Sequence, residues 1–339
     1  MKAFLATAPQ ILELVEQPIP EPASNEVLVK TRTVGICGSD IHLFRGDHPY
    51  TTYPMIFGHE ASGIIAALGK GVSGFAEGEH VVLEPLIPCG KCYPCSVGRR
   101  NCCSNMKTVG VTANGALAEY FTVPDYCIHK IPESLSFSLA ALAEPFSIGF
   151  QAASRGAINN NDQVVIIGSG TIGLTILAAA RQAGARVLIS DFIDNRLEIA
   201  CKMGADVVVN SQRENLPERV MGWTHGFGAS VVIEAVGSPA TIESTIALAA
   251  DAGRIVIAGV TKEKFGFRGV DVTKKELTIC GTRNNLFKFG DAINFILANP
   301  ELSENMITHT YSFAETPAAF KTANEKPVET CKVMIEFEK

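Results

Sequence analysis

The sequence predicts an α/β protein built from a barrel-like β part and a doubly wound parallel sheet. The chain has 339 residues, which at about 150 residues per domain points to two domains. Short β-branched runs separated by Gly and Pro fill the first 146 residues, whereas strand-like and helix-like segments alternate from about residue 162. A hydrophobic share of 47% with 19% charged residues is that of a folded protein and excludes disorder.

The first part of the chain, residues 1–146, is predicted to be all β. Its apolar runs are short and bounded by turn residues, a pattern typical of strands in a barrel. They are Glu26–Arg32, Gly63–Ala67 and Glu79–Leu83. The Ala-rich stretch Leu139–Ala153 predicts a helix that leads out of this part.

The end of the chain, residues 284–339, is too short to fold alone and finishes on a strand-like Lys332–Phe337. We expect it to rejoin the first part, which gives one discontinuous domain of residues 1–146 and 284–339. Residues 147–283 then form the second domain.

The second domain alternates strands and helices. Its predicted strands are Val164–Ile167, Val187–Ser190, Val231–Glu234 and Arg254–Ala258, and its predicted helices are Ile172–Ala183, Asn195–Met203 and Ala240–Ala250. Such βαβ alternation requires right-handed crossovers and gives a parallel sheet that is covered on both faces.

Charge and hydropathy exclude several classes of function. The formal net charge of −6 provides no basic surface for nucleic acid or for an anionic membrane. No apolar run reaches the ~18–20 residues that cross a bilayer, and Met1-Lys2-Ala3-Phe4 leads into no signal sequence. We therefore expect a cytoplasmic protein without nucleic-acid or membrane partners.

A glycine-rich turn predicts a dinucleotide site. A predicted strand is followed by Gly168-Ser-Gly170-Thr171-Ile172-Gly173 and a helix. The three glycines permit a tight turn, the approach of a pyrophosphate and close helix–strand packing. Asp191, 18 residues past Gly173, would accept hydrogen bonds from the adenosine ribose and repel a 2′-phosphate, which no arginine in Phe192-Ile193 neutralises. The pattern favours NAD over NADP, and a glycine turn in an unliganded α/β domain is the alternative.

Five of the ten cysteines lie in one short stretch, and four of them have the spacing of a metal site. These four are Cys89, Cys92, Cys95 and Cys103. Four thiolates favour a closed tetrahedral zinc site, which is structural because it leaves no open position. Cys102 could compete for the fourth position, and an Fe–S cluster or redox disulfides are alternatives. Without a secretion signal, metal ligation is favoured over crosslinking.

Four further residues are candidate ligands of a second, catalytic metal. They lie in Gly35-Ile-Cys37-Gly38-Ser39-Asp40-Ile-His42, Gly58-His59-Glu60 and Ala143-Glu144-Pro145. Taken singly, each has an ordinary structural reading, such as a core thiol, a satisfied histidine or a charge at a helix terminus.

Together, these segments resemble the zinc-containing medium-chain dehydrogenases, and most closely the branch that holds sorbitol, threonine and sugar-acid dehydrogenases. The resemblance covers the whole chain, with the Cys37, His59 and four-cysteine segments, Glu144-Pro145 and the glycine fingerprint in the family's order. It implies a GroES-like, partly open β-barrel catalytic domain and a Rossmann NAD-binding domain. It also implies two zinc ions per subunit, one catalytic and one structural, with NAD as the coenzyme.

The resemblance assigns the catalytic zinc to Cys37 and His59, with Glu60 and Glu144 as the third ligand and its alternate or water-bridged partner. Simple alcohol dehydrogenases have a cysteine where this chain has Glu144, so the chain departs toward the polyol branch. Cys37 and one carboxylate neutralise Zn2+, so we hypothesise that only one glutamate binds directly. A metal with an open position can then acidify a hydroxyl, as zinc lowers the pKa of bound water from about 16 to about 7.

By the same resemblance, Asp40 would hold the ligating His59 in place. Ser39 and His42 would relay the alcohol proton to solvent by way of the coenzyme ribose.

Two further turns follow predicted strands, Glu234-Ala-Val236-Gly237 and Ala258-Gly259-Val260. Ligands of open α/β sheets bind at this carboxyl end, and by resemblance Val260 would hold the nicotinamide carboxamide, with Val236 beside it. Arg283 follows the last strand and is the best candidate to bind substrate hydroxyls or a carboxylate. An ion pair between Arg283 and a surface acid is the alternative.

The sequence thus predicts an NAD-dependent zinc oxidoreductase that converts a secondary hydroxyl to a ketone. The chain looks most similar to bacterial enzymes that oxidise C5 of L-gulonate or L-galactonate, so an aldonate is the expected substrate, and a neutral or phosphorylated polyol is second. A non-catalytic NAD-binding regulator is disfavoured by the intact ligand set, and a zinc-dependent hydrolase or hydro-lyase by the glycine fingerprint. The resemblance also implies a homodimer or homotetramer.

Overall fold

The computed structural model describes residues 1–338; residue 339, with which the predicted catalytic domain ends, lies outside them. The chain forms two compact units, one of Met1–Glu144 with the residues from Phe289 onward, and one of Pro145–Lys288. Across the described residues, no helix is long and apolar enough to cross a membrane.

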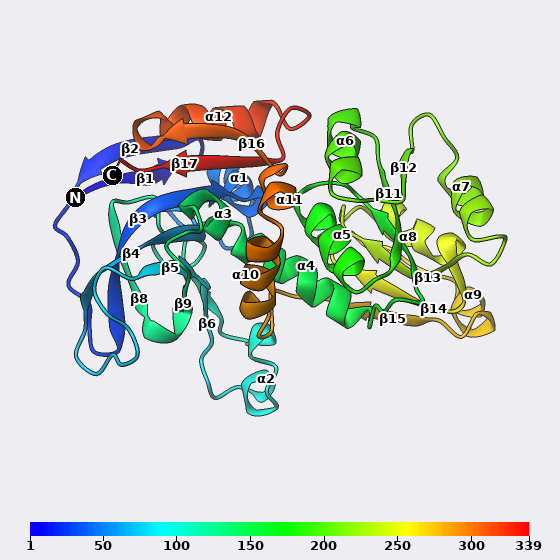
Figure 1. Ribbon diagram of the computed structural model, residues 1–339, viewed down its shortest axis with the longest axis horizontal. Helices are drawn as coiled ribbons and strands as arrows, with labels where there is room; N and C mark the ends of the chain where they lie inside the picture. Colours follow the sequence, from blue (N-terminus) through cyan, green and yellow to red (C-terminus); the bar gives the residue numbers. More distant parts are fainter. Residues whose placement is uncertain (339) are drawn as a thin grey trace. The chain divides into compact units, whose positions relative to one another are not determined.

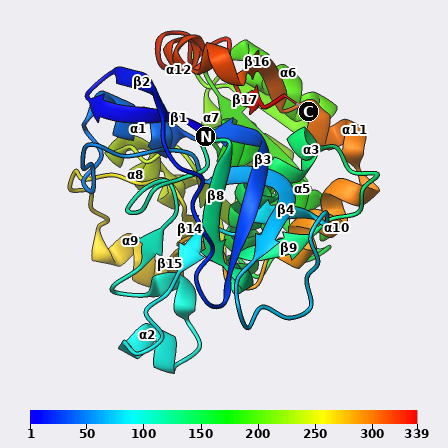
Figure 2. The ribbon, with the colours of Figure 1, turned by 90° about the vertical axis from the view of Figure 1, so that its left-hand side faces the viewer.

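The first unit is built on a seven-stranded sheet in the order β16-β17-β3-β4-β5-β9, with β8 pairing β3. These strands are β3 (Glu26–Ile36), β4 (Glu60–Leu68), β5 (His80–Leu83), β8 (Tyr120–Pro124), β9 (Ile128–Lys130), β16 (Ile307–Ser312) and β17 (Lys332–Glu336). Figure 2 shows β3 running beside β8 and β4. The chain end therefore completes a sheet that the first hundred residues begin, because β17 pairs antiparallel with β3 (Figure 1).

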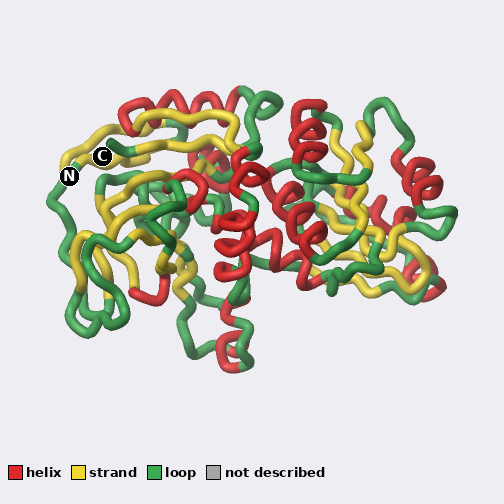
Figure 3. Tube along the Cα trace, in the orientation of Figure 1, coloured by secondary structure: helices red, strands yellow, loops and turns green. Residues whose placement is uncertain are grey.

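Two small two-stranded sheets and a set of short helices complete this unit (Figure 3). The two-stranded sheets are β1 (Lys2–Ala8) with β2 (Ile11–Glu16), and β6 (Leu86–Ile87) with β7 (Lys107–Thr108). The helices are α1 (Gly38–Arg45), α2 (Tyr93–Ser96), α3 (Phe137–Ala141), α10 (Phe289–Ala298), α11 (Pro300–Glu304) and α12 (Thr316–Glu325). Phe57 and Phe320 are fully buried in the core beside the sheet, so α12 packs onto the same core that the N-terminal strands form.

The second unit is a six-stranded sheet in the order β12-β11-β10-β13-β14-β15, and every neighbouring pair is parallel. Its strands are β10 (Gln163–Ile167), β11 (Arg186–Asp191), β12 (Val207–Asn210), β13 (Ala229–Glu234), β14 (Ala249–Ile257) and β15 (Thr278–Gly281). Its helices are α4 (Ala143–Arg155), which begins two residues earlier, α5 (Thr171–Gln182), α6 (Asp194–Lys202), α7 (Leu216–Trp223), α8 (Pro239–Leu248) and α9 (Gly269–Lys274). The strand order reverses at β10, which confirms the predicted doubly wound sheet.

Two predicted helices differ from the structure. The single helix Leu139–Ala153 is two helices, α3 and α4, because Pro145 lacks an N–H and fits only the first turn of a helix. The helix Ala240–Ala250 ends at Leu248, and β14 begins directly after it. Trp223 ends α7, and the Arg186 guanidinium lies 5.2 Å from its ring centroid.

The close pairing of β3 and β4 depends on Gly63. A Cβ at this position would lie 2.3 Å from the Lys30 carbonyl oxygen and 2.7 Å from Val29 Cγ1. We expect Gly63→Ala to destabilise the protein by about 2 kcal/mol, because backbone atoms must move to admit the methyl group. Thermal denaturation measures the change. Gly290→Ala in α10 is the matched control, since a Cβ there meets nothing within 4 Å, and an equal loss in both variants would contradict the steric argument.

Candidate active site and metal centres

Four cysteine sulfurs converge in a lobe that contains α2. Cys89, Cys92, Cys95 and Cys103 offer sulfur atoms that all lie within 4.8 Å of one another. The Cys92 sulfur is 3.5 Å from that of Cys95 and 3.8 Å from that of Cys103. Sulfurs about 2.3 Å from a tetrahedral zinc are separated by about 3.8 Å, whereas a disulfide needs about 2.05 Å. The residues present therefore fit a closed zinc site.

The lobe favours a thiolate at Cys92, whereas burial raises the pKa of Cys95 to about 12, and Cys102 lies outside the group. Backbone N–H groups of Cys95 and Ser104 lower the pKa of Cys92 to about 6. Cys102 is not among the four described cysteines that converge, although it adjoins Cys103, so the predicted competition for the fourth position is not seen.

Glu84, which the sequence did not single out, anchors the lobe to the sheet. Its carboxylate is buried and contacts Arg100 Nη2 at 3.2 Å and His129 Nε2 at 2.8 Å. The His129 ring is in turn stacked on Phe289, with centroids 4.9 Å apart. Arg100 belongs to a short 3-10 helix, Arg100–Cys102, inside the lobe. This contact fixes a segment with little apolar core of its own.

The second group of candidate ligands lies at the ends of two strands, β3 and β4. Cys37 follows β3 and precedes α1, and His59 directly precedes β4, whose first residue is Glu60. One ligand atom from each lies within 4.8 Å of the other two. A thiol, an imidazole and a carboxylate are a donor set that zinc accepts, and three protein ligands leave one position open. These residues fit a catalytic zinc.

Asp40 fixes the orientation of His59. Its Oδ1 lies 3.3 Å from His59 Nδ1, and its Oδ2 accepts a hydrogen bond from the Cys37 backbone N–H at 2.9 Å. Burial alone lowers the pKa of His59, but the Asp40 carboxylate and Cys37 outweigh it and hold that pKa well above its usual value. With Nδ1 facing Asp40, the Nε2 atom is the one available to a metal.

Glu60 has a partner that sequence reasoning missed. Both of its carboxylate oxygens contact Lys332 Nζ, at 2.7 and 2.6 Å, and both side chains are 1% exposed. Lys332 also donates to the Ile36 carbonyl oxygen at 3.2 Å. A Cβ on Gly35 would lie 2.3 Å from Glu60 Oε2, so the pair needs glycine opposite it. The signal available in the sequence was a lysine directly before the apolar run Val333–Ile335.

Glu144 lies near this group but is outside it. The described residues that converge are Cys37, His59 and Glu60 only. Glu144 is buried in the first turn of α4. Burial raises its pKa to about 7, with His59 opposing the shift and Glu60 adding to it. Glu60 thus pairs with Lys332, while burial favours a neutral Glu144.

The predicted relay residues both lie on α1. Ser39 Oγ is 3.5 Å from His59 Nε2. His42 is more than half exposed, and its Nδ1 lies 2.7 Å from Asp47 Oδ1. One residue of the helix thus lies at the candidate metal ligands and the other at solvent.

In the second unit, the glycine-rich turn connects β10 to α5, where Thr171 and Ile172 are the first two helical residues. Gly168 has φ of +98°, a conformation that other residues rarely adopt. A Cβ on Gly173 would lie 1.8 Å from the Gly168 carbonyl oxygen. A Cβ on Gly170 would meet nothing closer than 3.8 Å, so this edge of the turn is open to a ligand.

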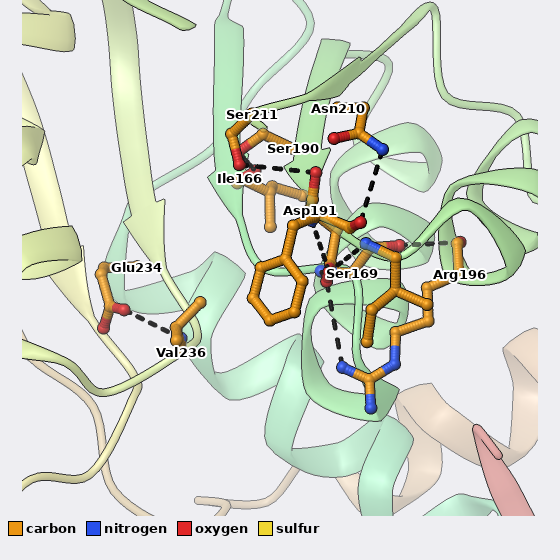
Figure 4. Close-up of polar contacts among 11 residues, drawn as sticks. Ile166, Ser169, Ser190, Asp191, Arg196, Asn210, Ser211, Glu234 and Val236 are labelled. Carbon is orange, nitrogen blue, oxygen red and sulfur yellow. Dashed lines mark hydrogen bonds and ion pairs between the residues drawn. The ribbon is translucent and has the colours of Figure 1, made fainter. Parts of the chain in front are cut away.

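Asp191 ends β11 with both carboxylate oxygens already hydrogen-bonded. Oδ2 accepts from the Ser169 N–H at 2.7 Å, and Oδ1 accepts from Phe192 at 2.7 Å and Ile193 at 3.0 Å. Figure 4 shows Ser169 and Arg196 beside Asp191. Arg196 Nη1 is 4.0 Å from Asp191 Oδ2. No arginine lies in Phe192–Ile193, but the first turn of α6 brings Arg196, which the sequence did not single out, close to Asp191.

The remaining predicted residues lie at strand ends of the same unit. Val236 follows β13 and is 48% exposed, and Val260 follows β14 and is 91% exposed. Two apolar side chains this exposed at the carboxyl end of a parallel sheet are available to a ligand. Arg283 follows β15 and is exposed.

Comparisons with known proteins agree with this architecture. Residues 23–133 match the alcohol dehydrogenase GroES-like domain, and residues 171–297 match zinc-binding dehydrogenase. The chain is 37% identical to starvation-sensing protein RspB of Escherichia coli K12 and 32% identical to L-galactonate-5-dehydrogenase of the same strain, each over 99% of both chains. A crystal structure described as a short chain alcohol dehydrogenase (rspB) from E. coli CFT073, complexed with cofactor NADH, has a TM-score of 0.93 at 36% identity, covering 99% of both chains.

The chain therefore belongs to the zinc-binding alcohol dehydrogenase family, and it is an oxidoreductase of that family. This confirms the predicted family, fold class and enzyme class. The fit of the two ligand groups to zinc agrees with the same assignment.

The geometry of the lobe predicts how zinc content responds to single substitutions. We expect elemental analysis of the purified protein to find zinc at both groups, with about one equivalent lost in Cys103→Ser, because a three-thiolate site binds the metal more weakly. Cys102→Ser is the matched control, because Cys102 adjoins Cys103 in the chain but its sulfur lies outside the group. Loss of zinc from Cys102→Ser with retention in Cys103→Ser would contradict the assignment.

The buried Glu60–Lys332 pair predicts a double-mutant result. Lys332→Met leaves Glu60 buried without its cation, and we expect a loss of stability of about 3–5 kcal/mol. Glu60→Gln combined with Lys332→Met removes both charges and should recover much of the loss. Chemical denaturation measures both. Equal stability of the single and double variants would show that the two charges do not depend on each other.

Proposed function

We propose that this chain is an NAD-dependent zinc dehydrogenase that oxidises the C5 hydroxyl of an aldonate, such as L-gulonate or L-galactonate, to a ketone. The observation that carries the proposal is the convergence of Cys37, His59 and Glu60 into a three-ligand group. A structural or purely regulatory metal has no need of an open position. The similarity to L-galactonate-5-dehydrogenase supports the choice of substrate class.

Cys37 and His59 would hold the zinc together with one glutamate. We propose that this glutamate is Glu60, because its carboxylate converges with Cys37 and His59. When bound, zinc supplies a Lewis acid that makes an alcohol easier to deprotonate. Lys332 balances the Glu60 charge. The net charge around the metal is therefore less negative than the charge of Cys37 and Glu60 alone. A less negative ligand set preserves the acidity of the metal.

Ser39 and His42 would move the proton. Ser39 Oγ lies 3.5 Å from His59 Nε2, so its hydroxyl can take the proton that the substrate hydroxyl loses. His42 lies three residues further along α1 with more than half of its side chain exposed. It can release that proton to solvent, which its exposed side chain contacts. The coenzyme ribose would connect the two.

Asp191 supports NAD over NADP. Three backbone N–H groups hold its carboxylate, so it cannot turn away from a 2′-phosphate. Arg196 is close enough for its charge to be offset by Asp191, which leaves no uncompensated cation for a phosphate. Gly168, Gly170 and Gly173, with Thr171 and Ile172, would receive the pyrophosphate at the N-terminus of α5. Val236 and Val260 would contact the nicotinamide half.

We further propose that Arg283 binds the substrate carboxylate, for which its planar guanidinium is suited. We also infer a cytoplasmic homodimer or homotetramer. None of the ten cysteines, all of which lie among the described residues, forms a disulfide, and the cytoplasm is a reducing compartment. In the described chain, β15 has a sheet partner on one side only, which leaves backbone groups for a second copy.

A second candidate is a non-catalytic NAD-binding regulator, because one relative is named a starvation-sensing protein. Such a protein would bind NADH and fail to turn over any alcohol. The intact three-ligand group favours catalysis.

A substrate panel tests the proposal. With NAD+ we expect NADH formation to be fastest with L-gulonate or L-galactonate, slower with sorbitol or galactitol phosphate, and absent in Cys37→Ser because that variant loses a ligand. Cys201→Ser, an exposed thiol on α6, is the matched control and should keep full activity.

Persistent turnover in a folded Cys37→Ser variant would overturn the zinc mechanism. NADH binding without turnover of any panel member would favour the regulator. A clear preference for a neutral polyol would overturn the aldonate assignment alone.

A further inference from the structure

Three loops at the carboxyl end of the parallel sheet are in unusually close contact. A Cβ on Gly168 would lie 2.8 Å from Val236 Cγ2, and a Cβ on Gly237 would lie 2.6 Å from the Val260 carbonyl oxygen. A Cβ on Gly259 would lie 2.1 Å from the Gly237 nitrogen. The turns after β10, β13 and β14 therefore fix one another's position, and a displacement of the middle turn would displace both others.

One buried side chain holds the middle turn. Glu234 is the last residue of β13 and has no exposed surface. Its Oε1 accepts hydrogen bonds from the Val236 N–H at 2.9 Å, the Gly237 N–H at 2.8 Å and the Thr241 hydroxyl at 2.8 Å. Figure 4 shows Glu234 beside Val236. The carboxylate thus binds the turn and the first residues of α8 to the end of the strand.

The backbone of Glu234 holds the third loop as well. Its carbonyl oxygen accepts hydrogen bonds from the N–H groups of Ala258 at 2.8 Å and Gly259 at 3.0 Å. Its Oε2 atom would lie 2.6 Å from a Cβ on Gly259. Glu234 is therefore in contact with both loops that carry the exposed valines Val236 and Val260.

A carboxylate in this position is costly. Oε2 is buried and accepts no hydrogen bond from any described residue, and leaving a buried polar oxygen without a partner destabilises the fold. Hydrogen bonds from N–H groups to a carboxylate are roughly twice as strong as those to a neutral acceptor. The arrangement trades stability for a firmly held turn at the place where the coenzyme is proposed to bind.

We propose that Glu234 is a positioning residue for the coenzyme, which holds the Val236–Gly237 turn, and through it the Gly168 and Val260 loops, in their binding arrangement before the coenzyme arrives. This inference rests on the proposed NAD-dependent function. Glu234 itself is buried beneath the turn and acts through it. Without the carboxylate, the three loops must be ordered during binding, and the ordering weakens affinity.

The test compares folded variants of the zinc-loaded protein in equilibrium titrations with NADH. We expect Glu234→Ala to weaken NADH binding about tenfold or more and to raise the KM for NAD+ with little change in kcat. Glu234→Gln keeps an acceptor oxygen and should remain within about threefold of the original affinity. Glu234→Asp keeps the charge but shortens its reach, and it carries the test if the alanine variant does not fold.

Asp162→Ala is the matched control. Asp162 is a buried carboxylate at the amino end of the same sheet, bonded to the Asn159 N–H, Ser230 and Arg254. We expect it to lower the melting temperature without changing NADH affinity. Hydrogen exchange in the coenzyme-free protein adds a second readout, and the Val236 and Gly237 amides should exchange faster only in the Glu234 variants.

Unchanged NADH affinity in a folded Glu234→Ala or Glu234→Asp variant would overturn the inference. So would an equal loss in Asp162→Ala, which would indicate general destabilisation, or a loss in Glu234→Gln as large as in Glu234→Ala. Failure of the unsubstituted protein to bind NADH would overturn the proposed function instead. The exchange rates of the Val236 and Gly237 amides would then still decide whether Glu234 holds the turn.

Discussion

Two strands of the seven-stranded sheet carry a buried ion pair. It joins Glu60 of β4 to Lys332 of β17, and both side chains are shielded from water. A buried charge is tolerated only with a partner, so strands from distant parts of the chain are held in one register. Gly35 on β3 leaves the space that the pair needs. Glu60 also converges with Cys37 and His59. The same ion pair therefore stabilises the sheet of the first unit and places a carboxylate in its candidate metal group.

The second unit also depends on buried carboxylates, which here hold the turns at the ends of the strands. Its parallel strands end in turns that must remain open to a ligand and yet stay fixed. Small residues allow the turns to touch, and two buried carboxylates, Asp191 and Glu234, accept the backbone N–H groups that point inward. Each carboxylate belongs to the strand, the most rigid element available. The rigid strands thus fix the positions of the loops, where binding groups commonly lie.

Much of the site could be predicted because its residues are local in sequence. The four-cysteine lobe lies within fifteen residues, and the glycine turn is a continuous segment between a strand and a helix. The sequence did not identify the neighbours that only chain folding brings together. Lys332 reaches Glu60 only through strand pairing, and Arg196 reaches Asp191 only because α6 turns back. The predicted helix Leu139–Ala153 was wrong for a local reason, because a proline such as Pro145 fits only the first turn of a helix.

The sequence by itself determined the chemical inventory: which donor sets are present, the alternation that requires a parallel sheet, and the family. Only the tertiary structure decided which charges face each other. It placed Glu60 within the converging ligand group, left Glu144 and Cys102 outside, and gave Glu84, Lys332 and Glu234 their partners. The physical reason is that the energy of a buried charge depends on distances between residues far apart in the chain, and spacing along the sequence carries no information about those distances.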